Sequence, residues 1–162
     1  MNDESVTRIE SRNEFRAAVG TALAKAAQDG ASEICMIDPR FVDWPLNDPA
    51  IVELLSRWVS SRRRCLVMAH GFDDLVRAAP RFVEWRRQWS HVVQCRTTEE
   101  IEADQVPTLL WVREMACLKL LDRVRYGGTF SGREIDLVET RETIDALLQR
   151  SVEAFPATTL GL

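Results

Sequence analysis

Three short apolar segments separated by helical patterns constrain the fold of this chain more than any other feature. The segments are 33–38, 65–69 and 91–95. Each has the length and the flanking residues of a buried β-strand, and the intervening sequences have apolar residues at helical spacing. A strand, a helix and a second strand in this order require a right-handed crossover, which makes the two strands parallel. The sequence therefore predicts an α/β fold with a parallel core.

Helices are predicted before, between and after these segments. Ser11 and Glu14 fit a capping box, in which each side chain accepts a hydrogen bond from a free backbone N–H at the helix start. Pro80 interrupts one helical pattern and should divide it in two. The predicted helices cover 11–29, 48–59, 73–79, 80–89 and 138–155.

The stretch from Pro107 to Phe130 contains further apolar runs that are too close together for a crossover helix. It has the pattern of a β-hairpin, or of two strands in series, followed by a turn at Gly127–Gly128. We therefore expect a mixed, largely parallel β-sheet flanked by helices. One domain should span 1–162, with terminal tails at 1–10 and 156–162.

Composition and charge argue against several classes of protein. The chain has 46% hydrophobic and 28% charged residues, which is typical of globular proteins. No apolar run is long enough for a membrane span, and the polar first residues lack a signal-peptide core, so we expect a cytoplasmic protein. The net charge of −4 does not indicate a general polyanion binder.

The cysteines do not form a metal-binding motif. Cys35, Cys65, Cys95 and Cys117 include no CxxC spacing, and the chain has 2 histidines. Structural metal sites usually need clustered Cys and His, so we expect reduced, buried thiols and neither a metal nor a cofactor.

Candidate site residues follow from the position of ligands in open α/β sheets, beyond the carboxyl ends of the parallel strands. Asp38 and His70 follow neighbouring strands and would make a general base with its orienting partner. The alternative is that Asp38 caps an Asp-Pro turn and that His70 is hydrogen-bonded in a loop. Catalytic candidates are therefore Asp38 and His70, and ligand-binding candidates are Asp43, Trp44, Asp73 and Arg96.

Two arginine clusters offer a different hypothesis. They are 62–64 and the set Arg81, Arg86 and Arg87. Both could contact phosphate, which leaves weak binding of nucleic acid or of a phosphorylated ligand as an alternative function. The sequence contains no GxGxxG, GxxxxGK[ST], GxSxG or HExxH motif.

The order of elements resembles one half of the phospholipase D-like fold. The similar features are a strand that ends in Asp, a strand that ends near His-Gly, a late strand pair and a final helix. The chain is similar in particular to a bacterial group of degenerate phospholipase D-like domains without an assigned function. Active members of the superfamily carry HxKx4D followed by Gly-Ser and join two such halves at one site, so the resemblance implies a homodimer.

The catalytic residues of that family are missing here. If Asp122 is the motif's Asp, with Gly128–Thr129 in place of Gly-Ser, the histidine and lysine positions are Met115 and Cys117. If Glu114 is the Asp, they are Pro107 and Leu109. HxK occurs nowhere in the chain, so a phosphodiesterase of this type is not expected. The resemblance implies a non-catalytic binding or scaffolding domain, with a protein partner or a second copy. The alternatives are another kind of enzyme at Asp38 and His70, or binding through arginine.

Overall fold

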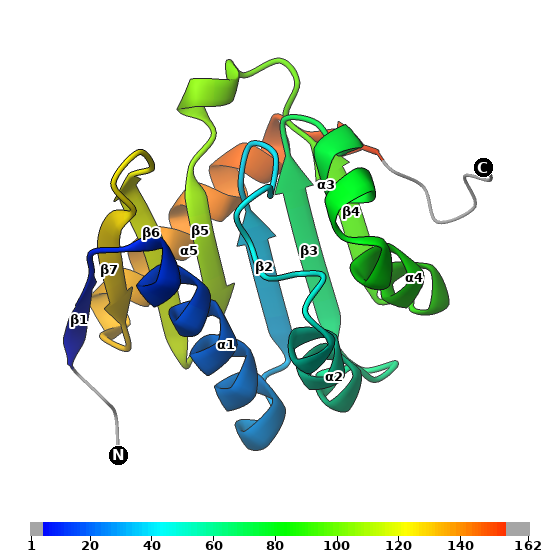
Figure 1. Cartoon of the computed structure of the whole chain (residues 1–162), viewed down its shortest axis with the longest axis horizontal. Helices are drawn as coiled ribbons and strands as arrows, with labels where there is room; N and C mark the ends of the chain where they lie inside the picture. The colour runs from blue at the N-terminus through cyan, green and yellow to red at the C-terminus, as the bar shows by residue number, and fades with distance from the viewer. Residues whose placement is uncertain (1–4, 155–162) are drawn as a thin grey trace.

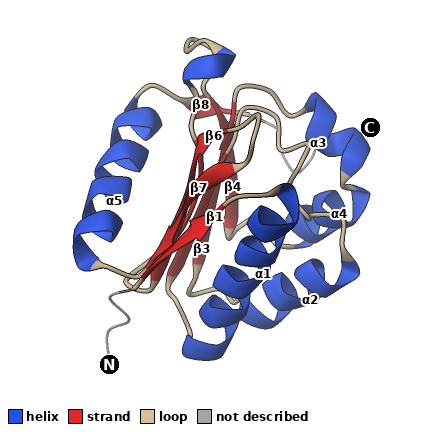
Figure 2. Cartoon of the chain, turned by 60° about the vertical axis from the view of Figure 1, so that its left-hand side comes forward, coloured by secondary structure: helices blue, strands red, loops and turns tan. Residues whose placement is uncertain are grey.

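The sheet has eight strands in the order β1-β7-β6-β5-β2-β3-β4-β8 (Figure 1). The computed structural model describes residues 5–154. Helices α1–α4 cover one face of the sheet, and α5 lies alone across the other (Figure 2). The strands are β1 (Val6–Ile9), β2 (Glu33–Ile37), β3 (Arg64–Ala69), β4 (Val93–Thr97), β5 (Thr108–Val112), β6 (Ala116–Asp122), β7 (Gly127–Ser131) and β8 (Val152–Glu153). The helices are α1 (Arg12–Asp29), α2 (Pro49–Trp58), α3 (Asp73–Ala78), α4 (Pro80–Gln88), the short 3-10 helix η1 (Ala103–Gln105) and α5 (Glu134–Gln149).

The parallel core predicted from the sequence is confirmed, but the sheet as a whole is not largely parallel. Strand β3 pairs in parallel with β2 and β4. The five other pairs are antiparallel. After β4 the chain crosses to the far side of β2 and enters β5 antiparallel, and the connections that follow are too short for a crossover. The predicted α/β class and the flanking helices are confirmed.

The helix starts and ends follow the local signals in the sequence. Ser11 caps α1, since its hydroxyl accepts a hydrogen bond from the backbone N–H of Glu14 at 3.1 Å. Gly30 ends that helix with a left-handed φ of 72°. Asp48 caps α2 and Pro49 occupies the first turn, where proline is tolerated. Pro80 opens α4 directly after α3, as its break in the helical pattern predicted.

Both ends of the chain differ from the expectation. Val6–Ile9, expected to lie in a frayed tail, form edge strand β1 and pair with β7. The final helix spans Glu134–Gln149, so it starts and ends earlier than predicted, and β8 follows it. The expected end of that helix at residue 155 and the tail 156–162 lie outside the described residues.

The hairpin predicted between 107 and 130 is present as β5 and β6, but Gly127–Gly128 is not a turn. Both glycines lie in β7, and the turn is formed by residues 123–126. Position 128 needs a glycine because β6 approaches β7 closely there. A Cβ at this position would lie 1.9 Å from the carbonyl oxygen of Lys119. The β6–β7 register shifts between Leu120 and Asp122 beside this contact.

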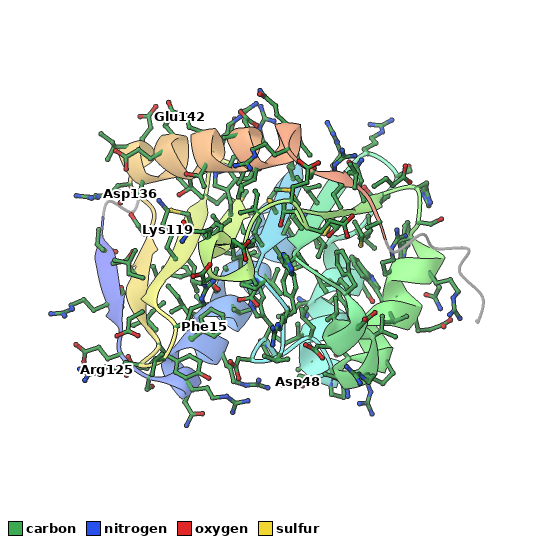
Figure 3. All side chains as sticks on the ribbon, turned by 90° about the horizontal axis from the view of Figure 1, so that it is seen from above. Phe15, Asp48, Lys119, Arg125, Asp136 and Glu142 are labelled. Carbon is green, nitrogen blue, oxygen red and sulfur yellow. The ribbon has the colours of Figure 1, made fainter. Side chains whose placement is uncertain are left out.

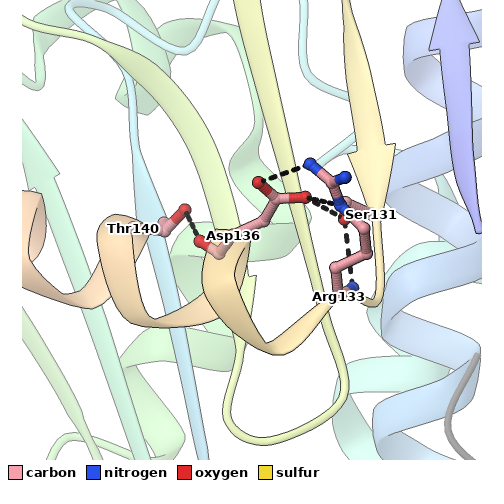
Figure 4. Close-up of polar contacts among 4 residues, drawn as sticks. All are labelled: Ser131, Arg133, Asp136 and Thr140. Atoms are coloured by element: carbon pink, nitrogen blue, oxygen red, sulfur yellow. Dashed lines mark hydrogen bonds and ion pairs between the residues drawn. The ribbon is translucent and has the colours of Figure 1, made fainter. Parts of the chain in front are cut away.

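A polar cluster fixes the start of α5 against β7 (Figure 4). The carboxylate of Asp136 accepts hydrogen bonds from Ser131 Oγ at 2.5 Å and from Arg133 Nε at 2.8 Å. The bond to Arg133, followed by that to Ser131, lowers the pKa of Asp136 below its usual value. The backbone N–H of Arg133 in turn donates to Ser131 Oγ, so one hydroxyl joins strand and helix.

The core has two parts, one on each face of the sheet. The larger part lies under α1–α4 and includes the fully buried Phe15, Leu55 and Trp58. The smaller lies under α5 and includes Trp111. All four cysteines are free and buried, as predicted. Burial raises the pKa of Cys95 to about 11 and raises that of Cys65 further.

Candidate functional site

A cavity of about 160 Å³ lies at the carboxyl end of β2, on the upper edge of the sheet in Figure 1. Figure 3 views the molecule from above this edge. Four parts of the chain meet there: α1, the loop after β2, the start of β5, and the end of β6 with the turn that follows. The lining residues are Phe15, Asp38, Pro39, Arg40, Val42, Asp43, Trp44, Thr108, Leu120, Arg123 and Tyr126.

Asp38 organises the loop that forms one wall. One carboxylate oxygen accepts a hydrogen bond from Thr108 Oγ1 at 2.5 Å, which ties the loop to β5. The other accepts from the backbone N–H groups of Arg40 at 3.0 Å and Phe41 at 2.7 Å. Phe41 has a left-handed φ of 61°, a conformation that these bonds help to hold. Both carboxylate oxygens of Asp38 are thus already engaged, one in capping the turn and the other with Thr108.

Asp43 joins the same loop to α1 and to the β6–β7 turn. Arg12 Nε lies 3.3 Å from a carboxylate oxygen of Asp43, and Arg16 donates to the Asp43 carbonyl oxygen at 2.9 Å. Tyr126 also forms a hydrogen bond with the Asp43 side chain. Burial and this bond raise the pKa of Tyr126 above its usual value.

Three hydrogen-bond donors at the cavity differ in how they are occupied. The guanidinium of Arg123 donates to the carbonyl oxygens of Asp104 and Val106, and so holds the turn against the segment before β5. The Arg40 side chain is exposed and has no hydrogen bond or ion pair to any residue from 5 to 154. Trp44 is 5% exposed, and its buried indole N–H has no partner in that same part of the chain.

Aromatic packing fixes the Trp44 ring. It meets Phe15 edge-on with 5.5 Å between ring centroids, and it lies 4.9 Å from the Phe41 ring. The indole is therefore held rigidly while its donor is unused. A buried donor without a partner is costly.

The structure brings together only some of the residues predicted at the strand ends. Asp38, Asp43 and Trp44 line the cavity, whereas His70, Asp73 and Arg96 do not. Nδ1 of His70 lies 3.0 Å from the carbonyl oxygen of Ile101, and no hydrogen bond joins it to Asp38 within the described chain.

The other two candidates are occupied or remote. Asp73 is exposed at the start of α3. Arg96 donates to the hydroxyl of Ser151 at 2.6 Å and to its carbonyl oxygen at 2.8 Å. It therefore anchors the segment after α5 to β4.

The arginine clusters are partly used in structural contacts. Arg63 donates to the carbonyl oxygen of Trp58. The backbone N–H of Arg81 donates to the side-chain oxygen of Asn47, and the Arg81 guanidinium donates to the Asn47 carbonyl oxygen. Arg87 pairs with Glu84 at 3.1 Å. Arg86 is buried and forms a hydrogen bond with Cys95. Within residues 5–154 the side chains of Arg62 and Arg64 form no hydrogen bond or ion pair, so part of the first cluster is still available to a phosphate group.

The turn of the β5–β6 hairpin bears on the two motif registers. Its turn is at 113–115, where Glu114 has a left-handed φ of 64°. This is the turn that the register with Glu114 as the motif's Asp assumed, and in that register Pro107 and Leu109 would occupy the histidine and lysine positions. Leu109 is 1% exposed in the core under α5, and no histidine lines the cavity.

Comparison with solved structures identifies the fold. TrmBL2, an archaeal chromatin protein whose structure shows a novel mode of DNA binding, matches with a TM-score of 0.66 and 11% identity over 93% of this chain. NucT from Helicobacter pylori matches with a TM-score of 0.60 and 7% identity over 93% of the chain. Phosphatidylserine synthase from Haemophilus influenzae matches with a TM-score of 0.55 and 12% identity over 98% of the chain. The chain has a phospholipase D-like fold.

At these identities the likeness is one of fold alone. The chain spans 99% of NucT, but only 54% of TrmBL2 and 41% of the synthase. No protein-family model and no curated protein matches the sequence. Between residues 5 and 154 there is no membrane-spanning helix and no group of three potential metal ligands.

Sequence reasoning missed the part of the site that comes from distant segments. Phe15, Thr108, Arg123 and Tyr126 reach the cavity only because α1 and the β5–β6–β7 strands pack beside the β2 loop. One signal was available, since 122–126 separates two strand-like runs and is polar enough for a turn. Assigning the turn to the glycines instead concealed Arg123 and Tyr126.

Proposed function

We propose that this chain is a non-catalytic phospholipase D-like binding domain, and that the cavity at the carboxyl end of β2 holds an anionic, phosphate-bearing ligand. The observation that carries the proposal is the Arg40 guanidinium, which is unpaired within residues 5–154 and belongs to a strand-end cavity that no histidine lines. A guanidinium that has no other partner can recognise phosphate, while covalent phosphoryl transfer by this superfamily's route needs an imidazole.

Other donor groups lie around the cavity, although most of them already have a partner. The Trp44 indole N–H is buried and has no partner within residues 5–154, whereas the hydroxyl groups of Tyr126 and Thr108 already bond to Asp43 and Asp38. Arg123 adds a second guanidinium, although backbone carbonyls already engage it. A phosphate has enough lone pairs to accept from several such donors at once.

The absence of turnover is supported by how Asp38 is used. Thr108 and two backbone N–H groups occupy its oxygens, so it is a poor general base. His70 faces the Ile101 carbonyl instead of the cavity. A phosphate-bearing ligand also fits the names of two structural neighbours, one of which binds DNA and one of which makes a phospholipid.

Titration with inorganic phosphate and with bis(p-nitrophenyl) phosphate tests the proposal. We expect both to bind, and we expect no release of p-nitrophenol above the buffer rate. Arg40→Ala should weaken phosphate binding by about tenfold, the usual cost of losing one charge-assisted contact. Arg62→Ala is the matched control, because Arg62 is also exposed and its side chain forms no bond within residues 5–154. Equal losses in both variants, or steady p-nitrophenol release, would overturn the proposal.

A further inference from the structure

We infer that copies of this chain associate head to tail, with the β6–β7 turn of one copy inserted into the groove between α2 and α4 of the next. This inference does not depend on the ligand proposed above. It rests on two surface features that the cavity does not explain, and on their complementary charges.

The first feature is an apolar projection at the β6–β7 turn. Val124 is 89% exposed and Leu121 is 82% exposed, more than any other large hydrophobic side chain between residues 5 and 154. Isolated apolar side chains are common on surfaces, but two of this size so close together form an exposed patch. We call this segment, residues 121–125, the projecting turn.

The projecting turn is held rigidly. One carboxylate oxygen of Asp122 accepts hydrogen bonds from the backbone N–H groups of Val124 at 3.0 Å and Arg125 at 3.1 Å. Arg123 reaches back to the carbonyl oxygens of Asp104 and Val106. Val124 is therefore presented to solvent by a preorganised loop, so that little conformational entropy is lost when a partner binds it.

The second feature is a groove of about 440 Å³ between α2 and α4. Most of the surface exposed in the groove is apolar. The lining residues are Pro49, Val52, Glu53, Ser56, Arg81, Glu84, Trp85 and Gln88. Trp85 is 3% exposed, and its buried indole N–H has no partner in the described chain. An inserted apolar side chain would contact the Trp85 side chain in the lining.

The charges of the two features are complementary. Arg125 makes no ion pair with any residue from 5 to 154, and it lies at the margin of the molecule in Figure 3. Glu53, at the groove, is likewise exposed and unpaired. The other charged groove residues are already engaged, since Glu84 pairs with Arg87 and Arg81 binds Asn47. An Arg125–Glu53 pair would thus orient the inserted turn.

The two features lie on different parts of the molecule. The projecting turn is at the β6–β7 end of the sheet, whereas α2 and α4 lie well apart from it (Figure 1). One chain cannot join its own turn to its own groove. The contact that we infer is heterologous and produces rings or chains, unlike the two-fold pairing that the superfamily resemblance implies. A single turn in a groove buries little surface, so association should be weak and concentration-dependent.

Light scattering and sedimentation of two surface variants test the inference. Val124→Asp removes the apolar projection, and Ser56→Arg fills the groove from an exposed position and repels Arg125. We expect the average mass of the wild-type chain to rise with concentration, and each variant alone to associate at least tenfold more weakly, as expected for a residue central to an interface.

Mixing the two variants gives the decisive result. The Val124→Asp chain keeps an open groove, and the Ser56→Arg chain keeps an intact turn, so the mixture should form one-to-one heterodimers and nothing larger. A wild-type chain that stays monomeric at every concentration overturns the inference. So does a dimer that both variants leave intact, or a mixture that remains monomeric. Circular dichroism of each variant verifies that it is folded.

Discussion

Replacing Gly128 with alanine should destabilise the protein far more than the same change at its neighbour Gly127. An added Cβ at Gly128 would lie 1.9 Å from the Lys119 carbonyl oxygen and 2.9 Å from the Leu120 Cα. The closest favourable C–H···O contacts are about 3.3 Å, so β6 and β7 would have to separate locally by roughly 1.4 Å. At Gly127 the nearest atom is the Asp122 Cβ at 3.6 Å, an ordinary contact.

The cost can be worked from this clash. Overpacking costs about 1–3 kcal/mol, and a weakened ladder hydrogen bond costs about 1 kcal/mol more. We expect Gly128→Ala to lose about 3 kcal/mol, which for a chain of this size lowers Tm by roughly 6–12 °C. Gly127→Ala should stay within about 1 kcal/mol of the wild type. Thermal unfolding followed by circular dichroism measures both variants.

The same experiment can refute the reasoning. If Gly128→Ala unfolds at the wild-type temperature, the strands are not as close at that point as the structure shows. If Gly127→Ala loses as much stability as Gly128→Ala, the effect comes from glycine content in β7 and not from contact with Lys119. Because β6 and β7 carry the turn with Arg123 and Tyr126, Gly128→Ala should also weaken phosphate binding.

Two further predictions concern ionisable groups. The pKa of Asp136 is lowered in the folded state, so its stabilisation is complete above the unfolded pKa of about 4 and is lost as pH falls through the folded pKa. Asp136→Asn should therefore lower the free energy of unfolding by about 1 kcal/mol at pH 7. In urea unfolding, the difference in this free energy between the variant and the wild type should shrink below about pH 4. A difference that stays constant with pH would contradict this. The buried cysteines, including Cys95 with its pKa raised to about 11, should react with a thiol reagent only as fast as the chain unfolds. Rapid labelling of the native protein would show that a thiol is accessible.

Local patterns predicted the elements whose neighbours in space are also their neighbours in sequence. The caps at Ser11 and Asp48 and the break at Pro80 depend on contacts within one helical turn. The strands β2, β3 and β4 were recognised by their length and apolar content, and their parallel order followed from the connecting helices.

The errors occurred where distant segments decide the structure. Val6–Ile9 have three exposed residues out of four, and they form a strand only because β7 offers an edge. Gly128 was assigned to a turn, since nothing local reveals that the β6 backbone approaches it so closely. Most strand pairs are antiparallel, and this likewise depends on the side of β2 at which the chain enters the sheet after β4.

The candidate site divides in the same way. The rule that ligands lie beyond the carboxyl ends of parallel strands found Asp38, Asp43 and Trp44. It also selected His70, which lies at the correct edge but bonds to Ile101. Tyr126 comes from the opposite half of the sheet, and its place beside Asp43 depends on the β6–β7 register.

The most direct test of the proposed function is the Trp44 indole N–H signal during a titration of the full chain with inorganic phosphate. The N–H groups of Trp58 and Trp111 are internal controls, because they donate to the carbonyl oxygens of Ala31 and Leu137. Trp44→Phe assigns the signal. We predict that the Trp44 signal shifts in a saturable way, that the two controls stay in place, and that Arg40→Ala moves the midpoint to higher phosphate. A Trp44 signal that does not respond, or a response confined to the controls, would contradict the assignment of the cavity as a phosphate-binding site.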